Sequence, residues 1–236
     1  MIVVIGDILI DEYIYGTSVR LSPEAPVPVL NKTGKDSRIG GAGNVARNVI
    51  AMGAKAHLAS VIGNDVSGKY LEQILGENSI GTSAIITELG RTTTVKTRII
   101  TGTEHMLRID EETSDPISDK AKSELKQAII ELLDKLEIDV IIVEDYDKGV
   151  MDVELANFLI EQAKSREIAI TVDPKLKNFK TYKGVTLFKP NLKELREGLN
   201  TDVDPGSESS LKAASEALNN TLEAQITLTT LGGDGI

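Results

Sequence analysis

The stretch RIGGAGNVARNVIAMG (Arg38–Gly53) places three glycines and an asparagine in front of an amphipathic helix. Apolar side chains recur from Val45 to Met52 at helical spacing, and Gly53 stands where a capping glycine often ends a helix. Glycines at a helix entrance let backbone N–H groups approach a ligand closely, and the helix dipole favours an anion there. The alternative is a tight loop that only needs positive φ angles. Both interpretations predict a helix over 44–52.

Composition narrows the class of protein. The chain has 236 residues, of which 41% are hydrophobic and 26% charged, as in one large soluble globular domain. Acidic residues outnumber basic ones by 36 to 26, and the net charge of -10 argues against a nucleic-acid or membrane-surface partner. The absence of cysteine excludes disulfides and thiolate metal sites. The opening MIVVIGD is typical of a core strand rather than a signal peptide, and no run reaches membrane-spanning length. We therefore expect a cytoplasmic protein.

Apolar runs typical of strands alternate with helical patterns along most of the chain. Continuous apolar strands separated by amphipathic helices predict a doubly wound α/β fold, with a mostly parallel sheet and helices on both faces. The expected strands are 2–6, 56–62, 82–86, 139–143, 168–172, 184–188 and 224–230. The expected helices are 44–52, 66–76, 118–136, 152–166, 191–199 and 207–219.

Two segments break this alternation. Residues 11–32 show no helical pattern and carry prolines, which sheets tolerate mainly in edge strands. Residues 92–110 alternate with period two. We expect a small β lid built from about 12–32 and 91–110, within one domain over 1–236. The basic excess of 91–110 is consistent with either an ordinary solvated strand face or a lid that meets an anionic substrate.

Polar residues follow most of the expected strands of the main sheet. In open α/β sheets the ligand binds beyond the carboxyl ends of the strands, so these residues predict a cleft rich in carboxylates and a few lysines. Each one alone is also typical of a helix N-cap or a turn. The segments are Gly6-Asp7, Gly63–Asp65, Glu144–Gly149, Asp173–Lys175, Lys189–Asn191 and Leu231–Gly235.

A dinucleotide-binding loop is one alternative for the glycines. Residues 41–46 fit the fingerprint G-x-G-x-x-A, and Asp65 lies at about the spacing of its ribose-binding acid. The fingerprint requires a strand directly before the loop, whereas LNKTGKDSRI (30–39) is polar and typical of a loop. This argues against a nicotinamide-dependent oxidoreductase.

Taken together, the motifs resemble the ribokinase-like (PfkB) family of sugar kinases. The segment Gly40–Ala46, followed by Gly53 and Gly63, is similar to the first signature of that family. Within the family the chain is most similar to kinase domains that act on D-glycero-D-manno-heptose 7-phosphate. That similarity rests on GDILIDEYIYGTSVRLSPEAPVPVL, RIGGAGNVARNV, EDYDKGV, VDPK and KPNLKELR, and it runs along nearly the whole chain.

The resemblance implies a sugar side of the site. It implies that the glycine loop and its asparagine hold sugar hydroxyls together with the acid after the first strand, so Gly40, Gly41, Asn44 and Asp11 are candidate sugar contacts. Asp7, Arg20 and Asp145 are further candidate substrate contacts. Arg98, Arg108 and Lys148 are candidates for holding a sugar phosphate, and a structural ion pair is the alternative for each arginine. For Asn44 the alternative is a helix cap.

The resemblance also implies a nucleotide side, with ATP and Mg²⁺ as co-substrate and metal. The turn Asn191-Leu192-Lys193-Glu194 matches the family's N-x-x-E, in which the glutamate, here Glu194, holds Mg²⁺ through water. Mg²⁺ suits such a site because it keeps several waters and takes few protein carboxylates. Thr230, Gly232 and Gly235 match a turn that lies against the nucleotide, and Lys175 is a candidate phosphate contact.

The family's catalytic base is an aspartate in D-T-x-G-A-G-D, and this motif is absent from the sequence. We therefore expect residues 1–236 to be a kinase domain truncated at its C-terminus, without a catalytic residue of its own. The expected function is phosphorylation of the heptose phosphate at its anomeric hydroxyl, for activated-heptose and lipopolysaccharide-core precursor synthesis. The alternatives are another sugar kinase of the family and a non-catalytic sugar-binding module. A homodimer through the β lid is expected.

Overall fold

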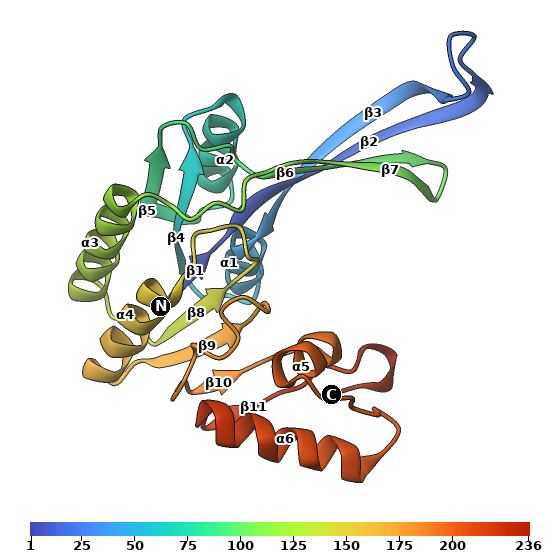
Figure 1. Ribbon diagram of the computed structural model, residues 1–236. Coiled ribbons are helices and arrows are strands. Elements are labelled where there is room, and N and C mark those ends of the chain that lie inside the picture. Colours follow the sequence, from blue (N-terminus) through green and yellow to red (C-terminus); the bar gives the residue numbers. More distant parts are fainter.

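The computed structural model describes residues 1–236 and contains two sheets. The larger one has seven strands in the order β11-β10-β9-β8-β1-β4-β5, and all of its pairings are parallel. This confirms the predicted doubly wound α/β class (Figure 1). Its strands are β1 (Ile2–Gly6), β4 (Ala56–Gly63), β5 (Gly81–Glu88), β8 (Val140–Glu144), β9 (Ala169–Asp173), β10 (Leu187–Phe188) and β11 (Ile226–Thr227).

Helices cover both faces of this sheet because successive strand residues point to opposite sides. Val3 and Ile5 of β1 belong to an apolar cluster with side chains of α3 and α4, whereas Val4 between them packs with α1 and α2. The helices are α1 (Ala42–Ala51), α2 (Val66–Glu77), α3 (Asp119–Lys135), α4 (Val153–Ser165), α5 (Leu192–Leu199) and α6 (Glu208–Leu222), with a short 3₁₀ turn at Gly232–Asp234. No helix is both long enough and apolar enough to cross a membrane.

The second, smaller sheet is present and has four strands in the order β3-β2-β6-β7. It projects from the main body as an arm (Figure 1). We call this sheet the arm; it comprises residues 8–41 and 95–111. Its strands are β2 (Ile8–Leu21), β3 (Pro28–Gly41), β6 (Val95–Thr101) and β7 (Glu104–Glu111).

The prediction of a loop over 30–39 was wrong, because these residues belong to β3. This strand pairs antiparallel with β2 from Ile8 opposite Gly41 to Leu21 opposite Pro28. Most of β3 is exposed or half-buried, which explains why its polarity resembles that of a loop. The glycine loop therefore does follow a strand. That strand belongs to the arm and is antiparallel, whereas the dinucleotide fingerprint needs a strand of the parallel sheet.

The alternating stretch 92–110 contains two strands rather than one. β6 and β7 pair antiparallel and are joined by a tight turn at Gly102, whose φ of 59° is in the left-handed region that glycine adopts freely. β6 also pairs in parallel with β2, with Asp11 opposite Lys96 and Tyr13 opposite Arg98. Side chains directly opposite one another share a face, so the basic side chains of β6 lie beside Asp11.

Candidate functional site

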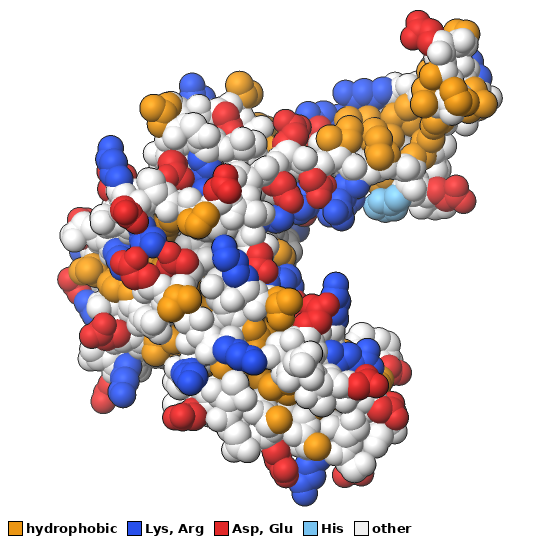
Figure 2. All heavy atoms as spheres, in the orientation of Figure 1, with side chains coloured by type: hydrophobic (Ala, Val, Ile, Leu, Met, Phe, Trp, Pro, Cys, Tyr) orange, Lys and Arg blue, Asp and Glu red, His pale blue; other side chains and the backbone are white.

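The ends of the parallel strands bring the predicted polar segments to one edge of the main sheet. Gly6 is paired with Glu144, and Glu144 with Asp173, so the residues that follow β1, β8 and β9 are direct neighbours. The arm rises from this edge, and Figure 2 shows a hollow between the arm and the C-terminal part of the molecule. Lys and Arg side chains line the face of the arm above this hollow.

Two glycines of the loop are closely packed, and Gly41 meets backbone whereas Gly40 meets side chains. Gly41 has φ 58°, and a Cβ there would collide with the carbonyl oxygen of Asp7. A Cβ on Gly40 would lie 2.5 Å from Oδ2 of Asp11. Gly40 therefore leaves the carboxylate of Asp11 next to bare backbone at the entrance of α1. This is the arrangement that the sugar-binding prediction for these residues needs.

Asn44 does not cap α1. The N-cap position is Gly41, and no side chain makes a capping hydrogen bond there. The Asn44 side chain is half-buried in the first turn of the helix and forms no hydrogen bond within the protein. The amide of Asn44 is therefore free to bind a ligand, which removes the helix-cap alternative.

Asp7 joins the glycine loop to the loop after β8. Its carbonyl oxygen accepts a hydrogen bond from the backbone N–H of Ala42 at 2.9 Å. Its carboxylate accepts three more, from the backbone N–H groups of Tyr146 (2.8 Å), Lys148 (3.1 Å) and Val150 (3.1 Å). Burial raises the pKa of Asp7 to about 6, although these three hydrogen bonds oppose the shift. Asp7 is 2% exposed, so in this conformation it positions the two loops rather than facing a substrate.

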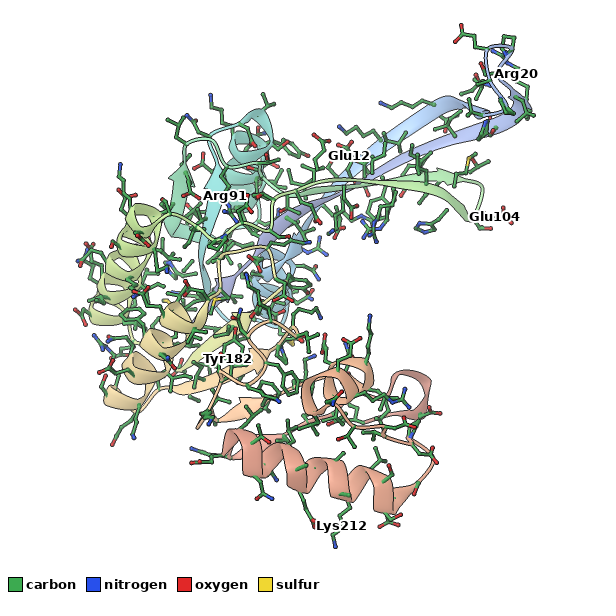
Figure 3. The ribbon with its side chains drawn as sticks, in the orientation of Figure 1. Glu12, Arg20, Arg91, Glu104, Tyr182 and Lys212 are labelled. Carbon is green, nitrogen blue, oxygen red and sulfur yellow. The ribbon has the colours of Figure 1, made fainter.

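Asp145 is similarly engaged. Its carboxylate accepts hydrogen bonds from the Tyr182 hydroxyl at 2.6 Å and from the Asn178 amide at 2.9 Å, and all three side chains are buried. Burial, then the Asp145 charge, raises the pKa of the Tyr182 hydroxyl. The sequence did not single out Tyr182 or Asn178. Figure 3 shows Tyr182 beside the loops that follow β9.

Each cation predicted to hold a phosphate is already paired with a carboxylate. Arg98 forms an ion pair with Asp11. Arg108 lies 2.9 Å from Asp110, and Lys148 lies 2.7 Å from Glu112. These pairs lie along the arm and at its junction with the loop after β8, so the structure brings the predicted cations together with carboxylates of the arm and of the segment that follows it.

Arg20 is the predicted contact that the fold does not bring to this group. It lies near the far end of the arm, at the end of β2, and is exposed (Figure 3). Arg91, by contrast, lies in the body of the molecule (Figure 3). It donates hydrogen bonds to the carbonyl oxygens of Lys148 and Asp115. Arg91 therefore holds the carbonyl group of Lys148, whose N–H is held by Asp7.

A second group of charges lies where β8 and β9 end. Asp173 pairs with Lys189 at 2.7 Å, and Lys175 pairs with Glu194. Glu144 is paired with Asp173 across β8 and β9, is 5% exposed, and its carboxyl group has no hydrogen-bond partner within the protein. Burial, with the neighbouring charge of Asp173, raises its pKa to about 8, so this carboxyl is largely protonated at neutral pH.

Six of the eight residues predicted for the nucleotide line one groove, whereas Lys175 and Glu194 lie outside its lining. Thr230 forms a parallel bridge with Asn191, which places the last turn of the chain against the start of α5. The groove has a volume of about 560 Å³. It is lined by Asn191, Leu192, Lys193, Arg196, Thr230, Leu231, Gly232, Gly235 and Ile236.

The N-x-x-E turn forms a capping box. The Asn191 side chain accepts the backbone N–H of Glu194 at 2.9 Å, and one carboxylate oxygen of Glu194 accepts the backbone N–H of Asn191 at 2.9 Å. The other oxygen of Glu194 pairs with Lys175. No three His, Cys, Asp or Glu side chains are gathered as metal ligands. A metal here would need nucleotide oxygens and water to complete its coordination, as is usual for Mg²⁺.

Asp65, the acid required by the dinucleotide alternative, caps α2. Its carboxylate accepts backbone N–H groups of Gly68 at 2.7 Å and Thr93 at 2.8 Å. Both oxygens are thereby used within the protein. With the antiparallel strand before the glycine loop, this removes the structural basis for ribose binding by Asp65.

Comparison with known proteins identifies related sequences along the whole chain. The family model for pfkB family carbohydrate kinases matches residues 1–236. The bifunctional protein HldE of Helicobacter pylori (strain G27) is 40% identical over 235 residues, covering 100% of this chain and 50% of that protein. The protein of the same name from Wolinella succinogenes is 38% identical over 236 residues and is covered to 49%. The chain thus spans about half the length of these curated relatives.

Solved structures share the fold at low sequence identity. Phosphofructokinase-2 from Escherichia coli, in complex with substrates and products, superposes with a TM-score of 0.76 at 17% identity, covering 98% of this chain and 73% of that one. Ribokinase from Arabidopsis thaliana, complexed with ribose and ATP, superposes with a TM-score of 0.70 at 12% identity, covering 98% and 72%. These likenesses confirm the ribokinase-like fold.

Proposed function

The chain belongs to the pfkB family of carbohydrate kinases, and from that premise we propose that it serves ATP-dependent phosphorylation of D-glycero-D-manno-heptose 7-phosphate at the anomeric hydroxyl. The single observation that carries this proposal is the glycine loop, where Gly40 leaves Asp11 beside bare backbone and Asn44 has no protein partner. The full-length similarity to HldE proteins supports a heptose phosphate among the sugars of the family.

The sugar would lie at the glycine loop. An ionised carboxylate accepts hydrogen bonds only, and the hydroxyls of a sugar can donate them to Asp11. Arg98 pairs with Asp11 and so holds this carboxylate in place. We therefore assign Arg98 to the orientation of Asp11, and the phosphate to cations nearer the base of the arm.

The nucleotide would lie in the groove between the last turn and the start of α5. The proposal is supported by the convergence there of Asn191, Thr230 and Gly232, each matched to the family from sequence alone. At the N-terminus of α5 the backbone N–H groups of Leu192 and Glu194 donate to Thr230 and Asn191, so it is the positive end of the helix dipole that favours phosphate there. Mg²⁺ would be held through water by the Glu194 oxygen that now pairs with Lys175, once that ion pair opens, and would neutralise charge on the transferring phosphoryl group.

Phosphoryl transfer by positioning requires little covalent chemistry from the protein. In this proposal Asp7 ties the glycine loop to the loop after β8, so that the sugar side of the site is one rigid unit. We propose a cytoplasmic location, because the proposed reaction consumes ATP.

A coupled assay of ADP release on the complete gene product tests the reaction and the substrate. We expect turnover with heptose 7-phosphate and Mg·ATP, with little turnover of fructose 6-phosphate, ribose or adenosine, and none after chelation of Mg²⁺. Equal turnover of another sugar would refute the heptose assignment and leave the kinase class intact. Sugar-phosphate binding by calorimetry without any turnover would favour the sugar-binding module.

A homodimer through the arm is the partner that the exposed surface supports. Leu107 is 55% exposed and Ile109 is 44% exposed on the face of β7 opposite to Arg108. Ile99 and Ile14 continue this apolar stripe across β6 and β2, because they are in register with Leu107. A second copy could cover the stripe by its own identical face. Sedimentation should show a dimer that Leu107→Lys dissociates, whereas a monomeric wild type would contradict this.

A further inference from the structure

Glu112 joins two lysines from different parts of the molecule. Its Oε2 lies 2.9 Å from Nζ of Lys96, and its Oε1 lies 2.7 Å from Nζ of Lys148. Lys96 comes from β6 of the arm, Lys148 from the loop after β8, and Glu112 from the segment that leaves β7. Two ammonium groups therefore converge on one carboxylate at the junction between the arm and the main body.

This cluster carries more positive than negative charge. Lys96 also contacts Asp110 at 3.2 Å, and Asp110 contacts Arg108 at 2.9 Å. Three cations thus face two carboxylates, within a protein whose net charge is -10. The side chains of Lys96, Lys148 and Glu112 are only 16–24% exposed, so solvent screens these pairs less than it would on an open surface.

The backbone of Lys148 is held by two hydrogen bonds, and its side chain makes one ion pair. The backbone N–H donates to the carboxylate of Asp7 and the carbonyl oxygen accepts from Arg91. The carbonyl oxygen of Asp7 also accepts the backbone N–H of Ala42, so the backbone of Lys148 has a fixed position relative to the glycine loop. The contact of its ammonium group with Glu112 is the one ion pair that the Lys148 side chain makes.

We propose that Lys96 and Lys148 form the site for the phosphate monoester of the substrate, and that Glu112 occupies this site as an internal anion until the phosphate replaces it. This inference rests on the proposed function, because it places the phosphate of the proposed sugar. A phosphate monoester carries about -1.5 to -2 charges at pH 7 and three acceptor oxygens. It therefore satisfies two ammonium groups and the neighbouring Arg108 better than a single carboxylate does.

Calorimetric titration of the wild type and of Glu112→Gln tests the exchange. The probes are heptose 7-phosphate, fructose 6-phosphate, inorganic phosphate and the unphosphorylated heptose. Because Glu112→Gln removes the competing charge and keeps the shape, the dissociation constants of heptose 7-phosphate and inorganic phosphate should fall about three- to tenfold. That of the unphosphorylated heptose should not change. Lys96→Met should weaken the binding of the probes that carry a phosphate group and leave the dissociation constant of the unphosphorylated heptose unchanged.

Glu104→Gln is the matched control. Glu104 lies at the end of the β6–β7 hairpin (Figure 3), is exposed and forms no ion pair, so its substitution makes the same change in net charge far from the cluster. Unchanged or weaker phosphate binding by Glu112→Gln, or equal tightening by Glu104→Gln, would overturn the proposal. Tightening for inorganic phosphate without selectivity for heptose 7-phosphate over fructose 6-phosphate would uphold the anion site and refute the heptose assignment.

Discussion

Glu144→Gln should change how the stability of the protein depends on pH. The carboxyl of Glu144 is buried beside Asp173 without a hydrogen-bond partner, and its pKa is raised from 4.5 to about 8. The folded state therefore holds the proton more tightly than the unfolded state. This contribution to stability is fully present below pH 4.5 and is lost as the pH rises through 8. Glutamine has nearly the same shape and cannot ionise, so the variant lacks this loss.

The size of the effect follows from the shift in pKa. At about 1.4 kcal/mol per pKa unit, the whole shift corresponds to about 5 kcal/mol. Between pH 6 and pH 9 the unfolded state is ionised throughout, whereas the folded wild type becomes ionised only near pH 8. Linkage then predicts that Glu144→Gln gains about 2–3 kcal/mol of unfolding free energy relative to the wild type over this interval.

Urea denaturation at pH 6, 7, 8 and 9 measures this difference directly. Glu216→Gln is the control, because Glu216 is exposed on α6 and forms no ion pair. Asp7, whose pKa is also raised, contributes equally to the pH dependence of the wild type and of Glu144→Gln, so its contribution cancels in the difference between them. If the unfolding free energies of the wild type and Glu144→Gln ran parallel from pH 6 to pH 9, the assignment of a buried, protonated carboxyl at this position would be wrong.

Three further substitutions test the local arrangement. Gly41→Ala should lower the unfolding free energy by about 2 kcal/mol or more, because φ is positive and the Cβ meets Asp7; an unchanged urea midpoint would contradict this. Tyr182→Phe should lower the unfolding free energy by about 1–3 kcal/mol, since Asp145 then loses a buried donor. An unfolding free energy equal to that of the wild type within experimental error would refute this. Asp65→Ala should lower stability by about 1–2 kcal/mol as a lost helix cap and leave sugar affinity unchanged; weaker sugar binding in calorimetry would contradict the cap assignment.

Periodicity predicted the main body of the fold because burial imposes it. Strands such as β1 and β8 are apolar on both faces, and helices such as α3 carry one apolar stripe, so both patterns appear directly in the sequence. β3 was missed for the opposite reason. It is held by pairing with β2, and most of its side chains are exposed or half-buried, so nothing in its hydrophobic pattern distinguishes it from a loop.

The candidate site was predictable in its position and less so in its contacts. Parallel strands fix the edge at which Asp7 and Asp145 lie, but a sequence does not tell whether such an acid faces a ligand or a neighbouring loop. In the structure both carboxylates hold parts of the protein. Glu112 was missed because its partners Lys96 and Lys148 are 16 and 36 residues away along the chain. The pairing of β6 with β7 brings Lys96 near Glu112, and the position of the loop after β8 adds Lys148.

Asn44→Ala tests whether the glycine loop binds the sugar. Calorimetry with heptose 7-phosphate and with ATP, and a melting temperature, should be measured on the same purified variant. Loss of one hydrogen bond of about 0.5–1.5 kcal/mol predicts a three- to tenfold weaker sugar affinity. The melting temperature should not fall, because Asn44 caps nothing, and the ATP affinity should not change, because no residue of the glycine loop lines the nucleotide groove. Unchanged sugar affinity would contradict the account.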